Sequence, residues 1–248
     1  MKASPLISII TITFNAADVI TPTMQSIAEQ TFRDFEHIIV DGASSDNTIM
    51  VARQIGGKDL RIISEPDNGL YDAMNKGLAM ACGKYVLFLN AGDAFHSPQT
   101  LAAYAEGAKK KPDIIYADTV IVDSNRNYIK PRHLSAPDIL TFRSFEKGML
   151  VCHQAFMVKK ELAPEYNIDY RFSADFDWCI RCLKKSKPGK CLNLHTVAID
   201  YLNDGLTDKN KIASLKERFD IMRKHYGLVT TVGNHFSFIS RALKRNLK

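Results

Sequence analysis

The residues best suited to bind a ligand are polar side chains that directly follow apolar, β-branched segments. Asn15, Asp41, Glu65 and Asn90 each close a segment of this kind. Parallel strands present their carboxyl ends along one edge of a sheet, and ligands bind beyond that edge. We therefore expect these four side chains to face a common crevice.

Asp41 opens the short loop Asp-Gly-Ala-Ser-Ser-Asp, which ends at Asp46 just ahead of a helical segment. A carboxylate at a strand end can accept a hydrogen bond from the imide N–H of a nucleobase, whereas Asp46 is placed to cap the following helix. Either aspartate could serve only as a turn or capping residue. Its position favours ligand binding for Asp41, and capping is the better interpretation for Asp46.

Asp93 follows the segment Tyr85–Leu89, whose unbroken apolar character indicates a strand that is buried on both faces. The residues between them are Asn90, Ala91 and Gly92, and such small residues would allow a diphosphate to approach. One or two carboxylates together with phosphate oxygens can satisfy Mg²⁺ or Mn²⁺. The alternative is an ordinary turn, in which Asn, Gly and Asp are common.

These residues require a sheet to position them, and the first half of the chain alternates between strand-like and helical segments. This alternation predicts an α/β fold with a mostly parallel central sheet that is flanked by helices. The strand-like segments are Ile7–Thr13, Glu36–Asp41, Leu60–Ser64, Tyr85–Asn90 and Asp113–Ala117. The helical segments are Ala17–Gln30, Asp46–Ile55, Gly69–Cys82, Ser97–Lys109, Asp175–Lys185, Lys209–Tyr226 and Val229–Leu247. Residues 119–164 are less regular.

Three motifs in series resemble those of family 2 glycosyltransferases, which have the A-type nucleotide-sugar-binding fold. The motifs are Asp41-Gly-x-Ser-x-Asp, then Glu65-Pro-Asp-x-Gly-x-Tyr-Asp-Ala-Met-Asn-Lys-Gly, then Phe-Leu-Asn90-Ala-Gly-Asp. Their order and spacing match the family from about Ile7 to about Asn203, and the second motif resembles bacterial members that build exopolysaccharide or O-antigen units. The resemblance implies an inverting hexosyl- or N-acetylhexosaminyltransferase that uses a nucleoside-diphosphate sugar, with uridine favoured.

The resemblance also implies which residues bind the donor. Asp41 would contact the nucleotide base, and the segment from Thr13 to Asn15 would lie under the base or ribose. Asp72 and Lys76 are assigned to the nucleotide as well, although the residues alone fit a solvated helix equally well. A loop at residues 203–207, with Lys209 and Lys211 beyond it, resembles one that closes over the diphosphate.

Asp93 would take the place of the final aspartate of the family's Asp-x-Asp metal motif. This chain departs from the motif because the leading position is Asn90 or Ala91. The protein would then supply a single carboxylate to Mn²⁺ or Mg²⁺, and the diphosphate would supply further oxygens.

Direct displacement at an anomeric carbon needs a base that takes the proton of the acceptor hydroxyl. The resemblance implies Asp175 as this base, with Asp177 as the second choice and as an acceptor-side residue. Asn90 and the pair His153-Gln154 resemble residues that such enzymes place beside the sugar and the acceptor. The alternative interpretations are that Asp175 only caps its helix and that a lone histidine is structural.

Composition excludes several other classes. The 248 residues suit one α/β domain with a small appendage. Five cysteines in a chain without an export signal indicate reduced thiols and a cytoplasmic location. The turn after the first strand lacks the glycines of a dinucleotide oxidoreductase, and no Gly-Lys-Ser/Thr sequence of a P-loop nucleotidase is present. A nucleotidyltransferase of sugar phosphates stays as the enzymatic alternative, and a basic-tailed binder of nucleic acid or lipid surfaces stays as the non-enzymatic one.

Positive charge is concentrated near the C-terminus. Residues 209–248 carry ten Lys and Arg against two acidic residues, whereas the residues before them carry a net charge of −2. We therefore divide the chain into a nucleotide-sugar-binding and catalytic domain, residues 1–208, and a basic helical appendage, residues 209–248. Nucleic acid is not an expected partner of the domain body.

The appendage carries a stripe of apolar residues at helical spacing, with basic residues gathered at its end. The stripe consists of Val229, Val232, Phe236, Ile239, Leu243 and Leu247. Such a helix can lie on an anionic membrane, here the inner face of the plasma membrane. That location fits a saccharide acceptor linked to a polyprenyl diphosphate, which the family resemblance implies. The stripe could instead pack on the domain body or on a second subunit of a homodimer.

Overall fold

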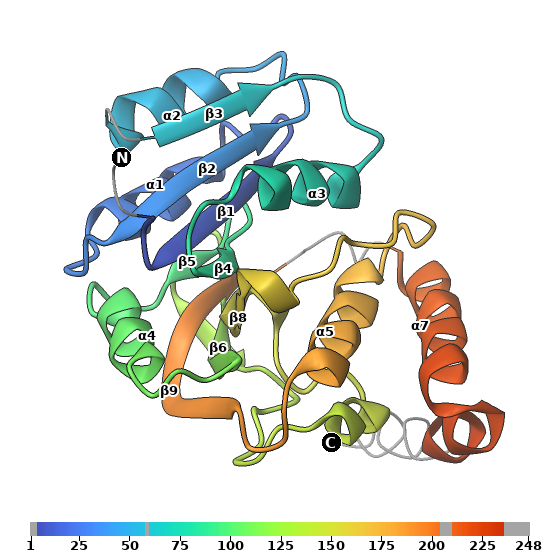
Figure 1. Cartoon of the computed structure of the whole chain (residues 1–248). Helices are drawn as coiled ribbons and strands as arrows, with labels where there is room; N and C mark the ends of the chain where they lie inside the picture. The colour runs from blue at the N-terminus through green and yellow to red at the C-terminus, as the bar shows by residue number, and fades with distance from the viewer. Residues whose placement is uncertain (1–3, 58–59, 204–209, 236–248) are drawn as a thin grey trace.

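The computed structural model describes residues 4–57, 60–203 and 210–235. Its centre is one twisted sheet with the strand order β3-β2-β1-β4-β8-β6-β9-β5, and β7 pairs with β6 outside that path (Figure 1). The strands are β1 Ile7–Thr13, β2 Phe35–Asp41, β3 Leu60–Ser64, β4 Tyr85–Phe88, β5 Ala94–Phe95, β6 Ile114–Val122, β7 Tyr128–Pro131, β8 Phe156–Lys159 and β9 Cys191–Leu202.

Strands β3, β2, β1 and β4 are parallel, which confirms the βαβ pattern expected for the first half of the chain. All seven residues of β1 are buried, as expected for a β-branched strand in the middle of a parallel sheet. The register pairs Thr13 with Asp41 and Asp41 with Ser64. The carboxyl ends of β1, β2 and β3 therefore lie side by side.

Beyond β4 the sheet becomes mixed. Strand β8 is antiparallel to both β4 and β6, and β6 is parallel to β9. The 12-residue strand β9 ends at Leu202, and its Asp200 pairs with Ala94 of β5, so its carboxyl end reaches the segment that follows β4. Two of these strands, β7 and β8, lie in the region whose sequence is least regular.

Helices cover both faces of the sheet (Figure 1). They are α1 Ile20–Ala28, α2 Thr48–Gly56, α3 Leu70–Met80, α4 Thr100–Ala108, α5 Ala174–Lys185 and α7 Lys211–Tyr226. One face of β1 packs in the same apolar core as α3 and α5, and the other face packs with α4 and the end of α1. Helices α1 and α2 enclose a smaller core over β2. The described residues also form three short 3₁₀ turns: η1 Phe142–Lys147, η2 His153–Ala155 and η3 Lys160–Leu162.

Helix α7 lies beside α5 on the side of the sheet that α3 also covers (Figure 1). Gly227, with a φ of 84°, ends α7 where the sequence predicts a break, and residues 228–235 form a further helix. The predicted apolar stripe extends to Leu247, but residues 236–248 lie outside the described part of the chain. The predicted closing loop at residues 204–209 lies outside it as well.

Candidate active site

Asp41 forms a buried junction at the ends of β1, β2 and β3. One carboxylate oxygen accepts hydrogen bonds from Ser64 Oγ at 2.6 Å and from the Ser44 N–H at 2.9 Å. The other oxygen accepts from Ser44 Oγ at 2.5 Å and from Thr13 Oγ1 at 3.4 Å. Thr13 and Asp41 are therefore brought together as the sequence predicts. The aspartate is completely buried and its oxygens are already engaged within the protein.

Asn15 and Asp46 connect the loop after β2 to the loop after β1. Asn15 adopts a φ of 46°, and its Oδ1 accepts a hydrogen bond from the Ser45 N–H at 2.9 Å. Asp46 accepts from the Thr48 N–H, at the first turn of α2, and from the Ala17 N–H, both at 3.0 Å. The Thr48 hydroxyl also donates to Asp46 and lowers the pKa of that carboxyl. Asp46 therefore bonds the first N–H of α2, although Asn47 and not Asp46 occupies the N-cap position.

Phe14 presents an exposed aromatic ring at this edge of the sheet, with 64% of the residue accessible. It lies against Gly42, where an added Cβ would stand 3.2 Å from the Phe14 ring and 2.6 Å from Asp67 Oδ2. The loops after β1, β2 and β3 therefore approach one another closely at Gly42, where a larger residue would require the Asp67 side chain to move. Phe14 was not singled out from the sequence, although a large aromatic residue directly after a buried strand was the available signal.

Asp72 and Lys76 lie on the first two turns of α3 and are engaged with the turn that precedes it. Asp72 accepts a hydrogen bond from the Asn68 N–H at 3.0 Å. Lys76 Nζ pairs with Glu65 Oε1 at 2.9 Å and donates to the Pro66 carbonyl oxygen at 2.9 Å. These contacts bind both side chains to the β3–α3 turn, and it is Asp67 of that turn that approaches Gly42 in the loop after β2.

Asp93 lies in the buried loop after β4, and contacts from two distant segments fix its orientation. Its Oδ2 accepts a hydrogen bond from Gln154 Nε2 at 2.7 Å, and its Oδ1 accepts one from the Leu202 N–H at 3.0 Å. The thiol of Cys152 donates to Gln154 Oε1 at 2.6 Å, which turns the amide nitrogen toward Asp93. Burial raises the pKa of Asp93 to about 6, despite the opposing effect of these two hydrogen bonds.

Asn90, His153 and Asp175 form a continuous chain of side chains from β4 through η2 to α5. Asn90 Nδ2 lies 3.3 Å from His153 Nε2, and His153 Nδ1 lies 3.3 Å from Asp175 Oδ2. The hydroxyl of Tyr71, on α3, donates to Asp175 Oδ1 at 3.3 Å. Three residues predicted separately from the sequence therefore meet at one place. Tyr71 is an additional member of this group. It belongs to the second motif, but the sequence analysis gave it no role of its own.

The carboxylate of Asp175 is 16% exposed, and two opposing effects act on it. Burial raises its pKa, but the hydrogen bond and charge of His153, the charge of Arg218 and the hydrogen bond from the Phe176 N–H together lower it by more, so that the net pKa lies below the ordinary value. A base whose pKa is tuned toward neutral pH would need a raised pKa. The pKa of this carboxyl is instead lowered overall. Asp175 is therefore an ionised carboxylate at neutral pH, ready to accept a proton.

A stack of aromatic rings supports this arrangement. Tyr166 lies between Tyr71 and Trp178, with ring centroids 5.6 and 5.0 Å apart. The backbone of Tyr166 is fixed in turn by Asn75 of α3, whose side chain bonds both its N–H and its carbonyl oxygen. The stack joins α3 to α5, and it holds Tyr71 in place next to Asp175.

Asp177 does not belong to this site. Its Oδ1 pairs with His225 Nε2 at 2.7 Å and its Oδ2 with Arg181 Nε at 2.6 Å. The side chain therefore connects α5 to α7. Residues two apart on a helix point in different directions, so Asp177 does not lie beside Asp175. These contacts therefore do not agree with the predictions of Asp177 as an acceptor-binding residue and as an alternative base.

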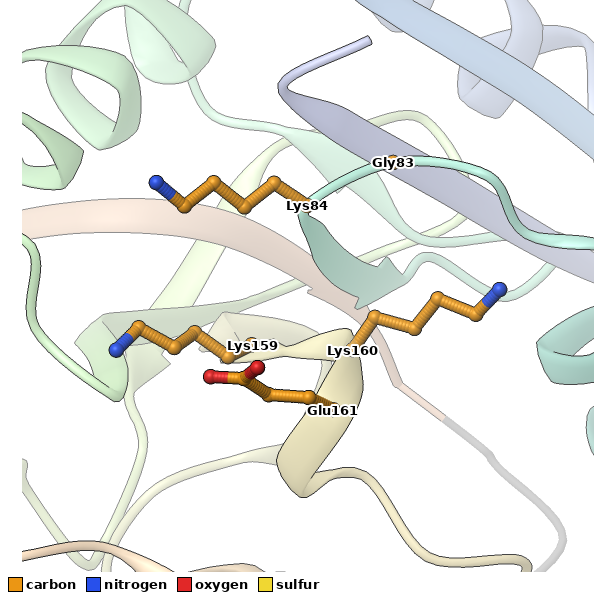
Figure 2. A pocket seen from close by; sticks show the side chains of 5 residues that line it. All are labelled: Gly83, Lys84, Lys159, Lys160 and Glu161. Carbon is orange, nitrogen blue, oxygen red and sulfur yellow. The ribbon is translucent and has the colours of Figure 1, made fainter. Parts of the chain in front are cut away.

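A hollow of about 370 Å³ lies at the opposite edge of the sheet. Figure 2 shows the residues that line it: Gly83, Lys84, Lys159, Lys160 and Glu161. These residues stand at the amino end of β4 and at the carboxyl end of the antiparallel β8. Lys159 pairs with Asp113 at 2.7 Å, and Lys160 donates to the Ala81 carbonyl oxygen. Two of the three ammonium groups are thus engaged, and Lys160 points away from the other two in Figure 2. The hollow is therefore separate from the polar chain at the strand ends.

Metal ligands are few among the described residues, where no group of three His, Cys, Asp or Glu side chains could hold an ion. One observation nevertheless fits a cation at the end of β4. The side-chain oxygen of Asn90 is buried and has no hydrogen-bond partner, although Asp93 stands three residues away in the same loop. An amide oxygen and a carboxylate are hard oxygen donors of the kind that Mg²⁺ and Mn²⁺ accept.

The fold and the strand-end loops define a transferase of the A-type nucleotide-diphospho-sugar class. The model of Glycosyl transferase family 2 matches residues 8–166. A PGL/p-HBAD biosynthesis glycosyltransferase of Mycobacterium bovis is 35% identical over 227 residues, which cover 86% of this chain and 85% of the relative. The amylovoran biosynthesis glycosyltransferase AmsB of Erwinia amylovora is 28% identical and covers 71% of this chain and 64% of its own. The chain belongs to glycosyltransferase family 2.

Solved structures agree on the fold. TarS 1-349 of S. aureus superposes with a TM-score of 0.73 at 16% identity, covering 94% of this chain and 72% of its own. TarS has also been solved with UDP-GlcNAc. The mannosyltransferase PcManGT of Pyrobaculum calidifontis, solved with GDP-Man and Mn²⁺, gives 0.65 at 17% identity and covers 96% of this chain and 76% of its own. The expected A-type fold is confirmed.

Proposed function

We propose that the chain transfers a hexosyl or N-acetylhexosaminyl group from a nucleoside-diphosphate sugar to an acceptor hydroxyl, with Asp175 as the base. The observation that carries this proposal is the chain Asn90–His153–Asp175 at the carboxyl ends of the strands. It supports the proposal because an ionised carboxylate, held by two neighbours, would then lie beyond the carboxyl ends of the strands, where ligands of such sheets bind.

The reaction is a single displacement. The acceptor oxygen forms a bond to the anomeric carbon while the bond from that carbon to the diphosphate oxygen breaks, so the configuration is inverted. The acceptor proton passes to Asp175, and the nucleoside diphosphate leaves with the bonding electron pair. A carboxylate with a lowered pKa is a weak base toward a free hydroxyl, but the hydroxyl becomes acidic as its oxygen bonds to carbon. His153 and Tyr71 hold the carboxylate in position during this step.

The donor nucleotide occupies the loops after β1, β2 and β3 in this proposal. The exposed ring of Phe14 offers a stacking surface for a base. Asp41 accepts the imide N–H of uracil, which requires one of its serine hydrogen bonds to yield. Thr13 and Asn15 lie beneath the base or ribose, and Asp72 and Lys76 border the same crevice. UDP is the proposed nucleotide because of the family resemblance and because TarS has been solved with UDP-GlcNAc.

Asp93 and Asn90 are the proposed protein ligands of one Mn²⁺ or Mg²⁺ ion. Such an ion, when bound, neutralises charge on the diphosphate oxygens. Gln154 and the Leu202 N–H hold the carboxylate in one orientation. Asp93→Ala should abolish metal-dependent binding of the nucleoside diphosphate in calorimetry. Unchanged dependence on Mn²⁺ in this variant would contradict the assignment.

The proposed acceptor is a saccharide of a bacterial surface polysaccharide or glycolipid, carried on a polyprenyl diphosphate at the inner face of the plasma membrane. The support is that one relative is named for PGL/p-HBAD biosynthesis and another for amylovoran biosynthesis. Within the described residues, no helix has both the length and the apolar character needed to cross a membrane.

The proposal is tested by a screen of nucleotide sugars with the full chain. A donor should raise the Tm in the presence of Mn²⁺ and should be hydrolysed slowly to the nucleoside diphosphate, because binding only to the folded state stabilises it. EDTA should remove both effects. Failure of every uridine, guanosine and thymidine donor to shift the Tm or to be hydrolysed would contradict the proposed function.

A further inference from the structure

Helix α7 contacts the segment that precedes Asp175, residues 170–173. Glu217 accepts hydrogen bonds from two successive backbone N–H groups: Oε1 from Arg171 at 2.8 Å and Oε2 from Phe172 at 2.9 Å. Hydrogen bonds to an ionised carboxylate are the stronger kind. A single side chain from α7 thus fixes the backbone three residues before Asp175.

Neighbouring residues of α7 make further contacts with the segment before Asp175. The buried hydroxyl of Ser214 lies 2.9 Å from the Ser173 hydroxyl, and Asp220 Oδ2 accepts a hydrogen bond from the Tyr170 hydroxyl at 3.3 Å. Ser214, Glu217 and Asp220 are spaced by three, so they share one face of the helix. This face of α7 therefore follows the segment 170–173 residue by residue.

The N-cap residue of α5 contacts α7. Ser173 occupies the N-cap position, but its side chain makes no capping hydrogen bond and lies against Ser214 instead. The Phe176 N–H is satisfied within α5, by the Ser173 carbonyl oxygen and by Asp175 Oδ1, so the contacts of α7 act on the N-cap residue and on the segment before it. The neighbouring Arg218 adds positive charge that acts on Asp175, with its guanidinium 5.9 Å from the Phe176 ring.

We infer that Glu217 is a positioning residue for the reaction, and that α7 sets the place of Asp175 through the backbone of Arg171 and Phe172. This inference rests on the proposed function of Asp175 as the base. Glu217 acts through Asp175 and touches neither substrate nor metal in this account.

The test compares kcat and KM for transfer by wild type, Glu217→Gln, Asp175→Asn and the double variant, all as full chains. Glu217→Gln keeps the size of the side chain, but its amide can accept only one of the two N–H bonds well. A small displacement of a catalytic group costs on the order of tenfold to a hundredfold in rate. We expect a fall of that size in kcat, with donor KM and donor binding unchanged.

Non-additivity separates positioning from other effects. If Glu217 acts through the base, Glu217→Gln should change the single-turnover rate less than about twofold when Asp175 is already Asn. Asp220 contacts the side chain of Tyr170 and not the backbone of residues 171 and 172. Asp220→Asn should therefore lower Tm without lowering kcat. Glu106→Gln, on the exposed surface of α4, makes the same chemical change away from the site and should match wild type.

The outcomes for the role of Glu217 and for the proposed function can be told apart. A kcat for Glu217→Gln equal to wild type, or an equal fractional loss in the Asp175→Asn background, overturns the inference while the proposed function stands. A wild-type chain that neither transfers nor hydrolyses any donor overturns the proposed function and the role of Glu217 with it. If Glu217→Gln does not fold, Ser214→Ala carries the test: a severalfold fall in kcat is expected, and an unchanged kcat overturns the inference.

Discussion

His153 holds two of the residues proposed for the reaction at the same time, because its ring nitrogens face Asn90 and Asp175. Burial alone would raise the pKa of the Asp175 carboxyl, and His153, Arg218 and the Phe176 N–H together outweigh that effect. Among them His153 lowers this pKa the most, and so helps to keep the buried carboxylate ionised. It also fixes the direction of the carboxylate, which Tyr71 approaches from the other side.

Replacement of this histidine should shift the pH dependence of the reaction. His153→Leu removes the hydrogen bond and the charge that most lower the pKa of Asp175, so this pKa rises. The base must be ionised to accept a proton, and the acid limb of the kcat profile should therefore move to higher pH. The measurement is kcat between pH 5 and pH 9. His96→Leu, which breaks the surface pair with Asp200, is the control. An acid limb that stays in place or moves to lower pH would contradict this account.

The elements of the parallel half are well predicted by the sequence, because short strands rich in apolar and β-branched residues alternate there with amphipathic helices. The predicted and observed bounds of β1 and β3 are the same, and α5 differs by one residue at its start. Strand β7 was missed because all four of its residues are exposed and it ends in a proline. Strand β9 was missed because His195, with a φ of 50°, and shifts in register interrupt its alternation.

The residues of the candidate site could be predicted where they belong to a recognisable sequence motif. Asn90, Asp93, His153, Gln154 and Asp175 are brought to one region by the structure. Asp177 is not, because its contacts with Arg181 and His225 are tertiary and leave no signal in the local sequence. Glu217 was missed for the same reason, since it bonds backbone groups 46 and 45 residues away.

Close packing of α3 on the sheet gives a prediction at the level of elements. An added Cβ at Gly77 would overlap Ile10 Cγ2 and lie 3.3 Å from Val40 Cγ2. Gly77→Ala should therefore lower the free energy of unfolding by about 1–3 kcal/mol, because overpacking outweighs the better helix propensity of alanine. Urea denaturation measures it. Gly233→Ala, in a helix with nothing within 4 Å of the added Cβ, should be neutral or stabilising. Equal or greater stability of Gly77→Ala would show that the packing is looser than described.

At the scale of the whole molecule, the C-terminal helices expose apolar side chains on the described part of their surface. Ile212 is 86% exposed, Val229 88% and Leu228 57%. Val229 begins the apolar stripe predicted from the sequence, and this part of the stripe does not pack on the domain body. The positive charge of residues 209–248 lies in the same region of the chain.

The full chain should therefore float with anionic vesicles in a density gradient, and a chain truncated after Tyr226 should not. Basic residues near an anionic leaflet contribute about 1 kcal/mol each, so flotation should weaken in high salt and with neutral vesicles. If neither chain floats, the helix is a packing element, on the domain body or on a second subunit, and the acceptor does not need a membrane.

The central claim is that Asp175 removes the acceptor proton and takes no part in holding the donor. The most direct measurement compares Asp175→Asn with wild type in two assays, donor binding by calorimetry and transfer under single-turnover conditions. The dissociation constant of the donor should stay within about twofold, whereas the transfer rate should fall by about 10²–10⁴, the usual contribution of a general base. Transfer at a near wild-type rate, or loss of donor binding in parallel with loss of transfer, would contradict the role given to Asp175.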